Sequence, residues 1–98
     1  MTHIIHTEYY YYIYDRDKED MIWYSPSSDD RRKCNRNLLN CIKEATRLVR
    51  MNPTANLDVY GHYSEMEGEY EYGDEGSFPV CTKEEFDEVA KKLKEELK

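Results

Sequence analysis

The fold is decided by residues 4–14, which read IIHTEYYYYIY. β-Branched and aromatic residues favour extended backbone, and successive side chains of a strand point to opposite faces. One face of this predicted strand therefore carries Ile5, Thr7, Tyr9, Tyr11 and Ile13, and the other carries His6, Glu8, Tyr10, Tyr12 and Tyr14. We assign the face with Ile13 to the core and expect Tyr10, Tyr12 and Tyr14 to lie outside it.

The segments that follow predict a hairpin and a long helix. A second strand-forming run, Met21–Ser25, comes after a charged turn and pairs with the first. The serines and aspartates of residues 25–30 predict a helix capped at Ser27, and Asn52-Pro53 ends this helix near residue 51. Its apolar stripe has a spacing of three and four: Cys34, Leu38, Cys41, Ile42, Ala45, Leu48 and Val49.

The C-terminal half predicts further strands and a second helix. Leu57–Tyr63 alternates as a third strand, and we expect part of residues 64–81 to pair beside it. Thr82 and Glu85 form a capping box, and the helix after it carries Phe86, Val89, Ala90, Leu93 and Leu97 on one face. The order ββαββα predicts an α+β fold, with an antiparallel sheet of about four strands and two helices on one face. We expect residues 1–98 to form a single domain.

Composition limits the function and the location of the protein. The 98 residues include 21 acidic and 14 basic side chains, a net charge of −7, so we expect neither direct nucleic-acid binding nor a membrane partner. Residues 1–14 lack the pattern of a secretion signal, and the three cysteines cannot all pair, which predicts a cytoplasmic protein. Leu, Ile, Val and Phe together number only 17, so we expect tyrosine rings to supply much of the buried surface of the core. A homodimer would bury further surface and add stability.

The histidines and cysteines do not follow the spacing of a metal or catalytic site. His3 and His6 fall on opposite faces of the first strand, and Cys34 and Cys41 fall on the apolar helix stripe, where buried thiols are ordinary packing. His62 is an isolated histidine on a polar strand. No glycine-rich phosphate loop or nucleophile elbow occurs in the sequence. We therefore expect no enzyme, no cofactor and no bound metal.

The long helix carries a basic stripe whose members recur at helical spacing with Asn40 between them: Arg32, Arg36, Lys43, Arg47 and Arg50. Residues 31–51 contain seven basic side chains and one acidic side chain, Glu44. One interpretation is a phosphate-binding surface for RNA or a nucleotide, with tyrosines stacking on the bases. The other, which we favour, is a solvated helix face of little energetic importance.

An acidic segment follows in residues 58–75, which contain seven carboxylates and no lysine or arginine. Within it Glu65, Glu67, Glu69 and Glu71 alternate with Met66, Gly68, Tyr70 and Tyr72. An extended strand would place these four carboxylates on one edge at intervals of about 6.8 Å, about half the charge density of one DNA strand. We expect the four glutamates, with Tyr70 and Tyr72, to contact a basic protein partner. Mimicry of a nucleic acid would need further acidic groups.

The tyrosines indicate the strongest candidate site. Tyr10, Tyr12 and Tyr14 are expected on the sheet face that the helices leave uncovered, joined by Tyr24 or Trp23 according to the register. Aromatic side chains are enriched at protein interfaces because they bury a large area and keep a polar group. We therefore predict a protein-binding surface on this face; the alternative is that the rings seal a homodimer.

The run Tyr9–Tyr14 and the acidic segment 58–75 resemble the small early proteins of bacteriophages, which include inhibitors of restriction and CRISPR systems. The resemblance implies an inhibitor of the anti-restriction or anti-CRISPR type. Our hypothesis is a non-catalytic protein that blocks a host nucleic-acid-processing enzyme by binding its basic surface. The alternative hypothesis is a module that binds RNA or a nucleotide through the basic stripe.

Overall fold

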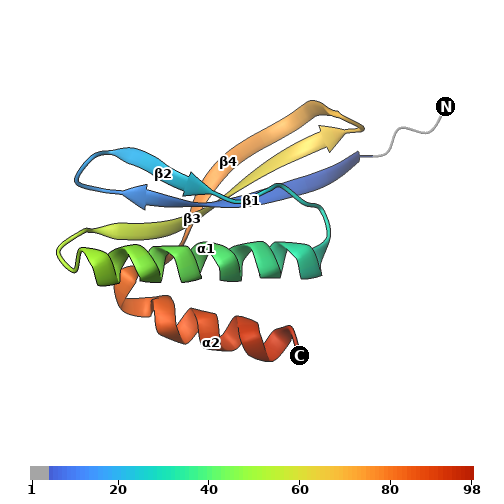
Figure 1. Ribbon diagram of the computed structural model, residues 1–98. Helices are drawn as coiled ribbons and strands as arrows, with labels where there is room; N and C mark the ends of the chain where they lie inside the picture. The colour runs from blue at the N-terminus through green and yellow to red at the C-terminus, as the bar shows by residue number, and fades with distance from the viewer. Residues whose placement is uncertain (1–4) are drawn as a thin grey trace.

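The computed structural model describes residues 5–98 and contains four strands and two α-helices. The elements in chain order are β1 (Ile5–Asp15), β2 (Asp20–Tyr24), α1 (Arg31–Met51), β3 (Leu57–Glu67), β4 (Tyr70–Thr82), the 3₁₀ turn η1 (Lys83–Glu85) and α2 (Phe86–Glu96). The strands form one antiparallel sheet in the order β2-β1-β3-β4. Both helices lie on the same side of the sheet (Figure 1), so the predicted α+β fold with the order ββαββα is confirmed.

β1 lies inside the sheet, and its register fixes which side chains share a face. Ile13 stands opposite Trp23 of β2 and Val59 of β3, on the side that the helices cover. Ile13 and Val59 are fully buried, Tyr11 is 9% exposed, and Tyr9 packs against the same cluster. The predicted assignment of Tyr9, Tyr11 and Ile13 to the core face is therefore confirmed.

α1 lies between the sheet and α2 (Figure 1), so it needs an apolar surface on two sides. The predicted stripe is buried at Cys34, Cys41, Ile42 and Ala45. Leu39 is also buried, although the predicted stripe omits it. Packing against the sheet alone would bury only a narrow stripe of α1. Because α2 packs on another side of α1, a wider part of the α1 surface is buried.

The ends of α1 show why it begins and stops where it does. Asp30 is the N-cap: its Oδ2 accepts a hydrogen bond from the Lys33 amide at 2.9 Å, which satisfies one of the free amides of the first turn. The prediction that Ser27 caps the helix is wrong, because Ser27 belongs to the segment 25–28 that is still hydrogen-bonded to β1. The helix ends at Met51, as predicted.

β3 and β4 form a longer hairpin than the sequence pattern indicates. The predicted third strand ended at Tyr63, whereas β3 continues to Glu67 and the chain reverses at Gly68 and Glu69. Gly68 has a φ of +61°, a left-handed conformation that costs a glycine little. β4 runs without interruption from residue 70 to residue 82, so the part of residues 64–81 that we expected to pair beside the third strand belongs to one continuous strand.

Two glycines of this hairpin leave room for aromatic rings of the neighbouring strand. Gly61 stands opposite Phe78, and a Cβ atom on Gly61 would lie 2.6 Å from Cε2 of that ring. Gly76 stands opposite Tyr63, where a Cβ atom would lie 3.1 Å from the ring. Phe78 also contacts Tyr9, at a distance of 6.5 Å between ring centroids. On the helix-side face of the hairpin, the rings of Phe78 and Tyr63 therefore pack against the backbone of these two glycines.

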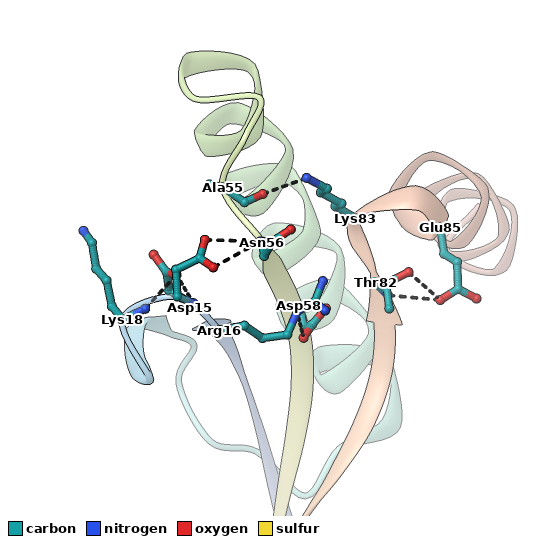
Figure 2. A network of polar contacts seen from close by, with 10 residues as sticks. Asp15, Arg16, Lys18, Ala55, Asn56, Asp58, Thr82, Lys83 and Glu85 are labelled. Carbon is teal, nitrogen blue, oxygen red and sulfur yellow. Dashed lines mark hydrogen bonds and ion pairs between the residues drawn. The ribbon is translucent and has the colours of Figure 1, made fainter.

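A polar network joins the β1–β2 turn to the start of β3 (Figure 2). Arg16 Nε lies 3.0 Å from Asp58 Oδ2, and the Arg16 amide donates to the Asn56 carbonyl at 3.0 Å. Asn56 Nδ2 donates in turn to Asp17 Oδ1 at 3.1 Å. Oδ1 of Asp58 is buried and has no hydrogen-bond partner among the described residues. The network fixes the turn but leaves one carboxylate oxygen unsatisfied.

The start of α2 is fixed by one local contact and one contact to a distant part of the chain, which Figure 2 also shows. The predicted capping box is present: the Thr82 amide donates to Glu85 Oε1 at 3.0 Å. Lys83 Nζ donates to the Ala55 carbonyl at 2.9 Å. Lys83 therefore links the start of the second helix to the loop that follows the first.

Candidate protein-binding face

The sheet face that points away from the helices carries a connected group of aromatic rings. We call this surface the open face and define it by Tyr10, Tyr12, Tyr14, Tyr24, Tyr60 and His62. The register places Tyr12 opposite both Tyr24 and Tyr60, and Tyr10 opposite His62. The choice between Tyr24 and Trp23 is thereby settled: Tyr24 joins the open face, whereas Trp23 packs against the core.

The rings of the open face contact one another across the strands. Tyr12 stacks on Tyr60 with a centroid distance of 5.5 Å and an interplanar angle of 11°, and Tyr10 stacks on His62 at 4.9 Å and 29°. Tyr10 also contacts Tyr12 and Tyr24, with centroid distances of 6.2 and 6.5 Å. Cross-strand aromatic pairs stabilise a sheet and hold each other's orientation. The open face is therefore ordered before any partner arrives.

Burial on the open face comes from neighbouring rings, because no helix covers it. Tyr12, in the middle of the group, is 8% exposed, whereas Tyr24, at its outer side, is 67% exposed. Burial, together with the negative charge of Glu75, raises the pKa of the Tyr10 phenol, so it remains an uncharged hydrogen-bond donor at neutral pH. The open face thus combines a fixed centre with exposed phenol groups.

Carboxylates border these rings on the same face. His62 Nε2 lies 3.6 Å from Glu75 Oε2, and its Nδ1 is 3.2 Å from Ser77 Oγ. Near the start of β1, His6 Nε2 lies 3.0 Å from Glu8 Oε2. None of the four described strands contains a lysine or an arginine. The surface is therefore aromatic in its middle and acidic at its border.

The predicted row of four glutamates does not form, because the chain reverses within it. Glu65 and Glu67 lie on β3 opposite Thr7 and Ile5, which places them on the helix side of the sheet. Glu69 lies in the turn, and Glu71 is paired with Met66 on the open side. Extended backbone through residues 65–71 would have been needed for a single row, and the turn at residues 68–69 excludes it. The tip of the hairpin instead exposes Tyr70 and Tyr72, which are 79% and 59% exposed.

The basic stripe lies on α1, on the other side of the sheet from the open face (Figure 1). Arg32 Nη2 donates to the Leu97 carbonyl at 2.8 Å, and Arg47 makes two hydrogen bonds to Glu44, at 2.6 and 2.9 Å. Arg36, Lys43 and Arg50 are exposed, and their side chains have no partner within residues 5–98. The stripe and the open-face tyrosines do not form one surface, so a single ligand cannot use both without passing round the sheet edge.

The thiols are free and buried at all three positions, which confirms the expected packing of Cys34 and Cys41. Burial raises the pKa of Cys41 and of Cys81 to about 12, so neither thiol ionises at neutral pH. Within residues 5–98, no three histidine, cysteine or carboxylate side chains lie close enough together to hold a metal ion. His3 lies outside the described residues.

Tyr60, His62 and Glu75 belong to the candidate site but were not among its predicted residues. The signal for the first two is the alternation in residues 57–62: Leu57, Val59 and Gly61 face the helices, so Tyr60 and His62 must face away. Glu75 gives no such signal, because the irregular pairing between β3 and β4 shifts the alternation of β4.

No helix in the described part of the chain is long and apolar enough to cross a membrane. The chain matches no protein-family model, no curated protein and no solved structure.

Proposed function

We propose that the chain is a non-catalytic protein whose open face binds a basic surface of another protein. The observation that carries the proposal is the ordered group of rings with a border of carboxylates and without lysine or arginine. Arginine stacks on tyrosine rings and forms bidentate hydrogen bonds with carboxylates. A partner that presents arginine would therefore find both of its preferred contacts on one surface.

A second copy of the chain is a poorer occupant of the open face. Two open faces placed against each other would bury the border carboxylates Glu8, Glu71 and Glu75 of both copies in a contact to which the four described strands supply no lysine or arginine. Like charges at a desolvated contact oppose association, whereas a basic partner is attracted over a distance. The charge of the face thus favours a different protein over a homodimer.

Enzymes that process nucleic acids display arginine and lysine where they hold phosphates. An acidic, aromatic protein that covers such a surface would exclude the nucleic acid and block the enzyme. We therefore propose a stoichiometric inhibitor of a nucleic-acid-processing enzyme, of the kind that phages direct against host defence. The net charge of −7 supports fast association with such a target.

The test is affinity capture from a host lysate with the wild-type chain and three variants, followed by mass spectrometry. Tyr24→Ala removes an exposed ring, and Glu75→Lys reverses a border charge; both should lose the captured protein. Glu88→Lys is the matched control, because it makes the same charge change on α2, where Glu88 is exposed and pairs with Lys92 at 3.5 Å.

A nucleic-acid-processing enzyme captured by wild type and by Glu88→Lys, but not by the two open-face variants, would support the proposal. Capture that all four chains share equally would contradict a role for the open face. Loss of capture in the control alone would move the interface to α2. Far-ultraviolet circular dichroism of each variant shows whether it is folded.

A further inference from the structure

A hollow lies between α1 and the segment that connects it to β2. Its walls include Ser27 and Ser28 on one side and Lys33, Arg36, Asn37 and Asn40 on the other. The hollow encloses about 350 Å³ and opens to solvent. Sites for small ligands range from about 300 to 1,000 Å³, so this hollow fits the smallest class of ligand.

The wall opposite α1 is held in place by hydrogen bonds along its length. The Ser28 amide donates to the Tyr9 carbonyl at 2.9 Å, and the Tyr9 amide donates to the Ser28 carbonyl at 2.8 Å. Asn37 Nδ2 reaches from α1 to the Pro26 carbonyl at 3.3 Å. The segment is therefore tied both to the sheet and to the helix, so the hollow keeps its shape without a ligand.

Apart from Pro26, every side chain at the hollow can donate a hydrogen bond, and none is a carboxylate. Lys33 and Arg36 supply two positive charges, and neither side chain has a hydrogen bond or an ion pair within residues 5–98. The carboxylate of Asp30, which is near in sequence, accepts the Lys33 amide and so faces the end of the helix. By contrast, Arg47 on the same helix is occupied by Glu44.

We propose that this hollow binds the phosphate group of a small phosphorylated ligand. A guanidinium offers a planar pair of donors to two phosphate oxygens, and an ammonium adds a point charge. Asn40 and Ser27 supply further uncharged donors at the rim. The net charge of −7 repels a polyanion, which selects a ligand with one phosphate group over a nucleic acid. The site uses none of the residues that define the open face, although Pro26 and Ser27 also line a separate hollow beside Tyr10 and Tyr24.

The probes are inorganic phosphate and adenosine monophosphate, each titrated into the nitrogen-labelled full chain while amide chemical shifts are recorded. Both should shift the amides of Ser27, Ser28 and residues 33–40, and sodium chloride at equal ionic strength should not. Tighter binding of the nucleotide than of phosphate would mean that the organic part also contacts the walls. Equal binding would mean that the phosphate group alone is recognised.

Arg36→Gln should weaken phosphate binding about tenfold, because it removes the positive charge and its charge-assisted pair of hydrogen bonds while keeping a polar side chain. Lys43→Gln is the matched control: it removes one exposed charge from the same helix outside the hollow and should bind as the wild type does. Equal weakening by both variants would show a diffuse effect of charge and overturn the proposal. So would shifts that chloride reproduces, or unchanged binding in Arg36→Gln.

Discussion

β1 supplies tyrosines to both faces of the sheet, and the two sets have different neighbours. On the helix side, Tyr11 packs into a cluster of aliphatic residues and thiols. On the open face, Tyr12 is equally buried, but its neighbours are the rings of Tyr10 and Tyr60. The helix-side core is closed by another layer of the protein, whereas the ring group ends at Tyr24, which remains exposed. A face that is buried by its own rings leaves its outermost ring available to a partner.

The helix-side core should be the more sensitive of the two faces. Ile13→Ala removes a side chain that is 0% exposed between β2 and β3, and we expect it to lower the free energy of unfolding by about 2–5 kcal/mol. Ile5→Ala is the matched control, because Ile5 lies on the same strand and the same face but is 55% exposed. Urea unfolding followed by circular dichroism measures both. Equal losses would mean that the core does not centre on Ile13.

The sequence could predict this helix-side core because its signals are local. The alternation of β1, the helical spacing from Cys34 to Ala45 and the capping box at Thr82 each depend on nearby residues. Leu39 was missed because it lies one helical turn after Asn35, whose side chain hydrogen-bonds Glu96 of α2, and this second helix follows far along the chain. Element order and core faces were therefore predictable, whereas the width of the buried helix surface was not.

The candidate site was harder to predict because it depends on pairing between strands. Tyr10, Tyr12 and Tyr14 were placed on the open face from their alternation alone. Whether Tyr24 or Trp23 joins them depends on a register shift between Ile13 and Tyr14, which no local pattern shows. The glutamate row was wrong for the same reason: the turn at Gly68 converts a linear pattern into two strands with opposite directions.

A second prediction concerns the ring-over-backbone packing of the helix-side face. Gly61→Ala places a methyl group against the Phe78 ring, and we expect a loss of about 1–3 kcal/mol in the free energy of unfolding. Gly76→Ala is the graded control, since its methyl group would lie 3.1 Å from the Tyr63 ring and needs a smaller adjustment. Thermal unfolding of both variants ranks them. A larger loss of stability in Gly76→Ala than in Gly61→Ala would contradict the closer approach of the Phe78 ring to Gly61.

A third prediction separates stacking on the open face from simple burial. Tyr12→Leu keeps an apolar side chain but loses the stack on Tyr60, and we expect a loss of about 0.5–1.5 kcal/mol. Tyr24→Leu should change stability less, because Tyr24 is 67% exposed. Urea unfolding compares the pair. Should Tyr24→Leu be the more damaging change, the ring group would be centred on β2 rather than on the β1–β3 pair.

The smallest expected effect lies at the end of the open face, where Asp58 stands opposite Tyr14. Burial raises the pKa of the Asp58 carboxyl above its ordinary value; the charge of Arg16 opposes this shift and that of Glu84 adds to it. A raised pKa in the folded state means that protonation favours folding. The stabilising contribution of protonated Asp58 is complete below its unfolded pKa and is lost as the pH rises through the folded pKa.

Asp58→Asn should therefore leave stability at pH 7 unchanged or raise it by less than about 1 kcal/mol, since the amide carries no charge and the lost ion pair involves an exposed arginine. The advantage of the variant over the wild type should shrink as the pH falls below the folded pKa, because the wild-type carboxyl then becomes neutral as well. Urea unfolding of both chains at neutral and acidic pH measures this difference, in which the other titrating groups cancel. An advantage of Asp58→Asn that grows on acidification would mean that the ion pair with Arg16 lowers the folded pKa of Asp58 by more than burial raises it.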